Sequence, residues 1–151
     1  MKKLFILCFT LLVILAGCAS IPTTVQVFST ERGSRPDGPD GFIIRNSEEL
    51  NNVLTIFPGM DNTFNNRFFR NYGLVVLEIR GMGSFYTLEL INVEFQSNGT
   101  IFVNLDIISL SMEYEGQLIT NEVIVIRIRQ SSLRSMNQVE YDLWSHFDPV
   151  S

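Results

Sequence analysis

The chain has 151 residues, of which 46% are hydrophobic, with 11 basic and 16 acidic side chains. This length and composition indicate a folded domain with its own core and exclude a disordered stalk. Its only lysines are Lys2 and Lys3, so the chain beyond residue 17 has a net charge of 9 − 16 = −7. That balance excludes binding of nucleic acid or anionic lipid headgroups by bulk charge, and the lack of lysine there excludes Schiff-base chemistry.

The N-terminal segment is typical of a bacterial lipoprotein signal peptide. Two lysines precede an apolar run over residues 4–15, and the small residues Ala16 and Gly17 stand directly before Cys18. The run is shorter than the roughly 20 apolar residues that cross a bilayer. A cysteine thiolate can accept a diacylglyceryl group as a thioether, so we expect cleavage after residue 17 and lipid attachment at Cys18. The alternative is an ordinary secretory signal with a chance cysteine.

Lipid on Cys18 would anchor the chain in the cell envelope, because two or more acyl chains, such as palmitate, hold a protein firmly at a membrane. Ala19 stands where many lipoproteins retained in an inner membrane have aspartate. The outer membrane is therefore favoured if the source has two membranes. Residues 18–41 are expected to be a lipidated N-terminus and spacer, in which only residues 25–28 have the pattern of a short strand.

Residues 42–130 are expected to form the β-rich globular domain, which opens with a strand over residues 42–45 and a helix over residues 47–57. Within that helix the apolar residues fall on one face, at Leu50, Val53, Leu54 and Phe57. Asn46 and Glu49 have the spacing of a capping box, and Pro58 follows the helix. One amphipathic helix is therefore predicted.

The rest of this domain has the patterns of β-strands. Strands are predicted over residues 74–80, 85–95, 101–110 and 122–129. Asn98 and Gly99 between two of them favour a hairpin with a type I′ turn. The tail over residues 131–151 is mainly polar, with scattered apolar residues.

The order of these segments resembles the protease-complex lipoprotein domain family (PrcB-like). The resemblance covers about residues 41–129, and its motifs are Ser47-Glu48-Glu49-Leu50, Phe68-Phe69-Arg70-Asn71, Leu74-Val75-Val76-Leu77, Gly81-Met82-Gly83-Ser84-Phe85-Tyr86 and a strand that ends in Val93. The founding type of that family is a lipoprotein subunit of a protease complex. The resemblance implies an accessory role and supplies no catalytic residue.

Residue chemistry gives little support for an enzyme. His146 is the only histidine and lies in the tail, and with one histidine and a lipidated cysteine a zinc site lacks ligands. Glu113 and Glu115 could stand at a glycosidase spacing, but a solvated acidic loop explains them better. We therefore expect no catalytic residue, no metal and no cofactor.

Four aromatic residues are the candidates for an interaction surface, because aromatic side chains often anchor protein interfaces. They are Tyr114, Tyr141, Trp144 and Phe147. The alternative is that they fold back onto the domain's own core. An exposed edge strand could also accept a strand of a partner.

The expected fold is α+β: an antiparallel β-sheet of about four to six strands with one amphipathic helix packed on it. The expected function is a membrane-anchored, non-enzymatic accessory subunit of an envelope or secreted protease complex, with a protein partner and no nucleic acid. A lipoprotein that binds a small ligand or a peptide is the alternative, and a hydrolase comes third.

Overall fold

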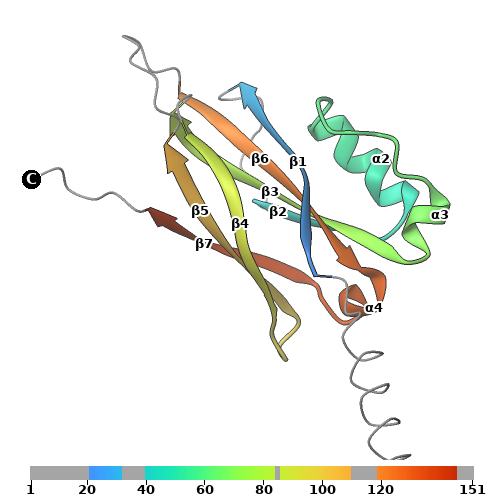
Figure 1. The fold of residues 1–151 in the computed structure, drawn as a ribbon. Helices are drawn as coiled ribbons and strands as arrows, with labels where there is room; N and C mark the ends of the chain where they lie inside the picture. The colour runs from blue at the N-terminus through green and yellow to red at the C-terminus, as the bar shows by residue number, and fades with distance from the viewer. Residues whose placement is uncertain (1–20, 32–39, 84–85, 110–118, 146–151) are drawn as a thin grey trace, which may run out of the picture.

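The computed structural model describes residues 21–31, 40–83, 86–109 and 119–145. Within these ranges the chain is mostly β-sheet with a few short helices (Figure 1). In chain order the elements are β1 (Thr23–Glu31), β2 (Gly41–Ile44), α2 (Ser47–Ile56), α3 (Asn66–Phe69), β3 (Tyr72–Gly83), β4 (Tyr86–Phe95), β5 (Thr100–Ser109), β6 (Ile119–Arg129), α4 (Gln130–Leu133) and β7 (Gln138–Ser145).

The strands form two sheets where the sequence predicted one. The first sheet has four antiparallel strands in the order β1-β6-β3-β2, and the second has three strands in the order β4-β5-β7. In the second sheet β4 pairs with β5 antiparallel, whereas β7 pairs with β5 parallel. Alternating apolar residues predict which face of a strand is buried but not which strand lies beside it, so a single sheet and a pair of sheets give the same pattern.

The molecule has three layers, because the four-stranded sheet is covered on both faces. One core lies between the two sheets and includes Val75, Leu77, Ile101, Val103 and Ile126. A second core lies between the four-stranded sheet and helices α2 and α3, which Figure 1 shows on its outer side. This arrangement explains the continuous apolar run of β3, since its residues 74–77 are fully buried on both faces.

Helix α2 begins and ends close to the predicted positions. Asn46 caps it by accepting a hydrogen bond of 2.9 Å from the backbone N–H of Glu49. The Glu49 carboxylate accepts from the N–H of Arg45, one residue before the expected capping-box partner. Leu50 and Val53 are buried in the second core. Among the described residues, no helix has both the length and the hydropathy to cross a bilayer.

Strand β1 corrects the expected spacer, because residues 23–31 belong to the folded domain. It pairs with β6 along nearly its whole length. Val27 packs against the core between the sheets, and Phe28 packs against the core below α2. Gln26 joins β1 to the segment after α2, donating to Gly59 O at 3.0 Å and accepting from Asp61 N at 2.7 Å. The polar residues that suggested a spacer are those of a sheet-edge strand.

Strand β7 and helix α4 correct the expected end of the domain at residue 130. Leu133 in α4 is fully buried, and Val139, Tyr141 and Leu143 in β7 pack against the core between the sheets. Between these residues, Glu140 and Asp142 are exposed. The alternation is the period of a half-buried strand, which was present in the sequence of the tail.

The hairpin between β4 and β5 has the predicted place but a different turn. Gly99 has φ +90, and no residue other than glycine has a positive φ among the described residues, which excludes the type I′ turn expected at Asn98. Gly99 N–H donates to Gln96 O at 3.1 Å, and Gln96 N–H donates to Thr100 O at 2.9 Å. This is a three-residue loop in which only Gly99 needs the left-handed region.

Candidate functional site

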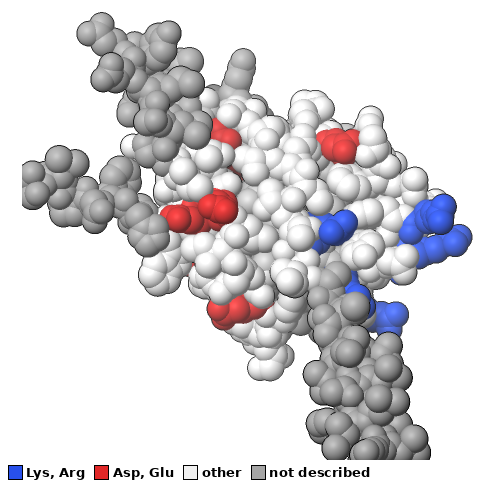
Figure 2. Space-filling model, viewed as in Figure 1, with Lys and Arg blue, Asp and Glu red and all other residues white. Residues whose placement is uncertain are grey.

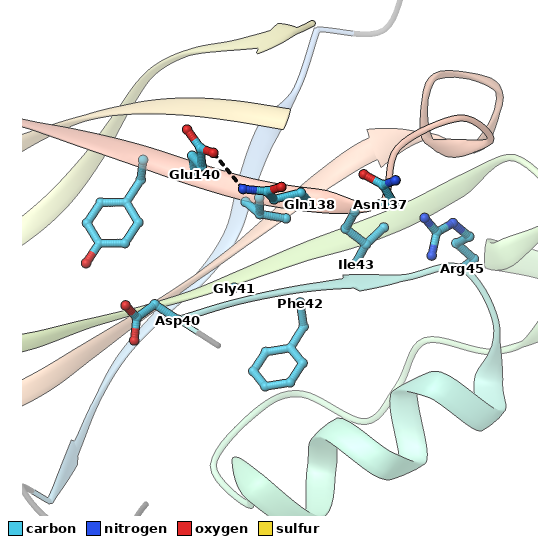
Figure 3. A pocket seen from close by; sticks show the side chains of 10 residues that line it. Asp40, Gly41, Phe42, Ile43, Arg45, Asn137, Gln138 and Glu140 are labelled. Carbon is cyan, nitrogen blue, oxygen red and sulfur yellow. Dashed lines mark hydrogen bonds between the residues drawn. The ribbon is translucent and has the colours of Figure 1, made fainter. Parts of the chain in front are cut away.

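The candidate site is a groove between β2 and β7, the edge strands of the two sheets on one side of the sandwich. We call it the β2–β7 groove; its volume is about 820 Å³. Figure 3 shows the two strands side by side, with Asp40 at one end of the groove and Arg45 at the other. The remaining lining residues are Gly41, Phe42, Ile43, Asn137, Gln138, Val139, Glu140 and Tyr141.

Both strands turn an open edge toward the groove. Within the described part of the chain, β2 pairs only with β3 and β7 pairs only with β5. Asp40 O accepts from Glu78 N–H in β3, and Gln138 N–H donates to Gly99 O beside β5. Backbone groups alternate sides along a strand, so the N–H and C=O groups of Gly41 and Ile43, and of residues 139, 141 and 143, point away from their own sheets.

A glycine permits the close approach of the two strands. A Cβ atom built on Gly41 would lie 2.9 Å from Val139 Cβ and 2.9 Å from Leu77 Cδ2, closer than carbon atoms pack. The neighbouring residue Phe42 points away from β7, toward α2 (Figure 3), and its ring meets the Phe57 ring edge-on at 6.0 Å. The absence of a side chain at Gly41 therefore lets β2 and β7 lie this close.

A charged cluster lies at the Asp40 end of the groove. An Arg80 guanidinium nitrogen lies 3.2 Å from Asp40 Oδ1, and Arg80 Nε lies 3.6 Å from Glu78 Oε2. Glu78 is only 1% exposed, and Asn121 Nδ2 donates to its other oxygen at 3.0 Å. Arg80 and Asn121 compensate the charge of the buried Glu78 carboxylate, which holds these side chains in place. Asp40 is about half exposed and can contact a ligand.

The Tyr141 hydroxyl belongs to the same end of the groove. Burial raises the pKa of Tyr141, and the negative charges of Asp40 and Glu78 raise it further, against the opposing effect of Arg80. The phenol therefore stays protonated at neutral pH and can donate a hydrogen bond.

Arg45 closes the opposite end of the groove and is held by backbone carbonyl groups. Its guanidinium donates to Leu133 O at 3.3 Å and to Met136 O. Gln130 Nε2 in α4 donates to Arg45 O at 3.0 Å. These bonds fix the end of β2 to α4 and to the start of β7, so the geometry of the groove is set before any ligand binds.

The structure describes two of the four residues predicted to form an interaction surface, and these two do not lie together. Tyr141 points inward and lines the β2–β7 groove, whereas Trp144 is 54% exposed in the same strand. An odd spacing of three residues places them on opposite faces of β7. The other predicted residues lie outside the described residues: Cys18, Tyr114 and Phe147, together with His146, Glu113 and Glu115.

Comparisons of the chain with models of protein families, with curated protein sequences and with solved structures give no match. The resemblance to the protease-complex lipoprotein domain family stays a prediction from the order of the segments. The function of the β2–β7 groove has to be argued from its own geometry.

The groove is suited to binding and carries no constellation for metal chemistry. The described residues contain no group of three or more His, Cys, Asp or Glu side chains that could hold a metal ion. What the groove offers is open backbone edges, a hydroxyl donor and opposite charges at its two ends. Arg80 and Glu78 were not predicted as site residues, although two charged residues spaced by two within an apolar strand indicate a polar cluster on one face of that strand.

Proposed function

We propose that this chain is a lipid-anchored, non-enzymatic binding subunit of an envelope or secreted protease complex. In this proposal the β2–β7 groove takes up an extended segment of a partner protein. The observation that carries it is the pair of open strand edges that lie beside each other along the groove. Fold class alone does not specify function, so the proposal rests on this site.

An extended peptide can bind in such a groove by adding as a strand to an open sheet edge. When a peptide adds to a sheet edge, main-chain hydrogen bonds supply affinity and alternate side chains supply specificity. In β7 the outward backbone groups belong to Val139, Tyr141 and Leu143. The Leu143 N–H already donates to Asp142 Oδ1 at 2.9 Å, so a segment could pair with Val139 and Tyr141 without displacing a side chain. Asp40 and Arg45 would then select for the charge at each end of the bound segment.

We also propose the lipid anchor and a fold with one amphipathic helix. Lipid on Cys18 would hold the domain at a membrane of the cell envelope, favouring the outer membrane where there are two. Helix α2 is taken as the one amphipathic helix of the α+β domain, with Leu50 and Val53 over the sheet, while α3 and α4 are single turns. No residue is assigned a catalytic role.

Site-specific photo-crosslinking of the full chain in the cells that produce it tests the groove. A photoreactive residue at Gln138 lines the groove, and a matched one at Asn52 is exposed on helix α2 and does not line the groove. We expect one protein adduct from position 138 and none from position 52, identified by mass spectrometry. Equal adducts at both positions, or none at position 138, would reject the groove as the docking surface.

Hydrogen exchange of the purified complex then tests the binding mode. If the partner adds as a strand, the amides of Val139 and Tyr141 become protected, because each gains a hydrogen-bond acceptor, whereas the Leu143 amide already donates to Asp142 Oδ1. The amides of Glu140 and Asp142 face β5 and should change little. Protection spread evenly over β7 would contradict strand addition.

A small ligand is the second candidate, and the size of the groove favours it. Its volume of about 820 Å³ is in the range of ligand sites in proteins. Denaturing the purified protein and analysing the released small molecules by mass spectrometry separates the two candidates. A stoichiometric small molecule without a crosslinked protein supports the ligand, and the reverse supports the peptide.

A further inference from the structure

A second pocket, which we call the arginine pocket, lies at the end of the domain that carries α3 and α4. Its volume is about 310 Å³ and its lining residues are Arg70, Asn71, Tyr72, Arg129, Gln130, Ser131 and Arg134. Three of these are arginines and none is acidic, in a chain whose net charge is negative. Figure 2 shows the basic side chains gathered at this end of the molecule, with the acidic ones elsewhere on the visible face.

Two of the arginines that line this pocket, Arg70 and Arg134, present their charges to an anion. Among the described residues, neither Arg70 nor Arg134 has a carboxylate within salt-bridge distance. Arg127, just outside the pocket, lies over the Tyr72 ring at 5.0 Å from its centroid. Guanidinium groups are the side chains best suited to bind phosphate, because their planar donors form paired hydrogen bonds with its oxygens.

The frame of the arginine pocket is rigid. Tyr72 and Arg129 are partners in the β3–β6 ladder, and Gln130 N–H donates to Asn71 O at 2.9 Å. Leu133 is fully buried, so α4 is fixed to the core. The site therefore does not depend on the ordering of a loop when a ligand binds.

The arginine pocket lies at the same end of the domain as the start of β1, the described strand that follows Cys18 in the sequence. Strand β1 begins at Thr23, whose partner across the ladder is Arg127 in β6. Only five peptide units separate Cys18 from Thr23, and five units span at most about 18 Å when extended. Lipid on Cys18 would therefore hold this end of the domain close to the membrane surface.

We propose that the arginine pocket binds the phosphate of an anionic phospholipid headgroup in the membrane that anchors the chain. The inference rests on the lipid anchor proposed above, because the anchor is what brings the pocket to the headgroups. It extends that function by fixing how the domain is oriented: the α3–α4 end faces the lipid. The negative net charge opposes nonspecific attraction to such a membrane, so recognition depends on these few arginines.

Binding is measured on the full lipidated protein in a neutral detergent, with water-soluble short-chain phosphatidylglycerol as the probe. Side-chain nitrogen NMR signals of arginine report the occupancy. We expect saturable binding that is at least tenfold tighter than binding of short-chain phosphatidylcholine. Arg70→Gln and Arg134→Gln should each weaken it about tenfold, since each removes a charge-assisted hydrogen bond.

Arg67→Gln is the matched control, because Arg67 is exposed in α3 and does not line the pocket. It removes the same charge from the same end of the domain and should leave the affinity within about twofold. An equal loss in Arg67→Gln would show a diffuse charge effect and overturn the pocket. Arg70→Lys keeps the charge but cannot form the paired hydrogen bonds of a guanidinium group. Its affinity should therefore lie between that of Arg70→Gln and that of the parent protein.

Two other probes distinguish a lipid headgroup from a free anion and from an acidic protein segment. Inorganic phosphate that binds as tightly as phosphatidylglycerol would overturn the headgroup in favour of a free anion. Tighter binding of a hexaglutamate peptide would overturn it in favour of an acidic protein segment. Mass spectrometry of the same preparation tests the anchor. An unmodified Cys18 defeats the proposed anchor and, with it, the orientation of the domain at the membrane, whereas a lipidated Cys18 without phosphatidylglycerol binding defeats only the arginine pocket.

Discussion

Gly41 and Val139 meet across the gap between the two sheets, and a Cβ atom on Gly41 would stand 2.9 Å from the Cβ of Val139. Gly41 lies in β2 near the start of the described domain, and Val139 lies in β7 near its end. This contact keeps the two edge strands beside each other and gives the β2–β7 groove its width. The groove thus depends on a residue without a side chain.

Gly41→Ala is expected to lower the free energy of unfolding by about 1–3 kcal/mol, because its methyl group overpacks a core that cannot yield easily. It should also weaken partner capture by moving β2 away from β7. Chemical denaturation measures the first effect, and crosslinking from position 138 measures the second.

Gly59→Ala is the control for this change. A Cβ at Gly59 meets only the Phe28 ring at 3.4 Å, an ordinary contact, so stability should change by less than about 0.5 kcal/mol. If both alanine variants behave alike, the close approach at Gly41 is not what limits the groove.

Phe28→Ala tests whether β1 is part of the domain. Phe28 is half-buried against the core below α2, so its loss should cost about 2–3 kcal/mol of folding free energy, less than a fully buried phenylalanine. Val25→Ala, in the same strand but 38% exposed, should cost under about 0.5 kcal/mol. A spacer outside the domain would make both changes neutral in thermal or chemical unfolding.

The strands inside the domain could be predicted from the sequence, but the domain limits could not. Runs such as residues 74–77 and 101–105 bury enough apolar surface to be visible as strands wherever they pair. Strand β1 is an edge strand that contains threonine, glutamine and serine, and such a composition is also typical of a linker. Strand β7 pairs with β5 in parallel, a contact that depends on chain segments far apart in sequence.

Asn121→Ala is expected to destabilise the fold by about 1–3 kcal/mol, because it removes a hydrogen bond from a buried carboxylate. Asn121 donates to Glu78 Oε1 at 3.0 Å, where Glu78 is 1% exposed. Asn92→Ala, on the exposed face of β4, is the comparison and should change stability by less than about 0.5 kcal/mol. Equal unfolding midpoints for the two variants would show that the Asn121 bond adds nothing.

The pH dependence of stability tests the environment of Tyr141. Its pKa is raised in the folded protein above the ordinary value near 10, first by burial and then by Asp40. The neutral phenol is therefore favoured by folding, and its contribution is present below about pH 10 and is lost as the pH rises through the raised pKa. Tyr141→Phe should lose less stability than the parent protein from about pH 9 to pH 11.

Denaturation midpoints over that pH range measure the difference between the two proteins. Below about pH 9 the difference should be constant, because the phenol is protonated in both the folded and the unfolded chain. Parallel curves up to about pH 11 would mean that folding does not perturb Tyr141.

The candidate sites were less accessible to prediction than the fold, for a physical reason. Tyr141 could be singled out as an aromatic residue, but its role as a groove wall depends on β2, which the sequence places near the opposite end of the chain. The arginine pocket is invisible in the net charge of −5, because charge composition does not reveal which arginines gather. Arg70 and Arg134 line the same pocket only because α3 and α4 flank the β3–β6 ladder.

The antiparallel register of β1 and β6 also determines how the domain would bear a load. With lipid on Cys18, force from a partner drawn away from the membrane enters at Thr23, the first residue of β1. The hydrogen bonds to β6 lie perpendicular to the strands, so a pull along β1 strains all of them at once and none can open alone. The edge strand that looked like a linker would then act as a mechanical clamp between the membrane and the captured partner.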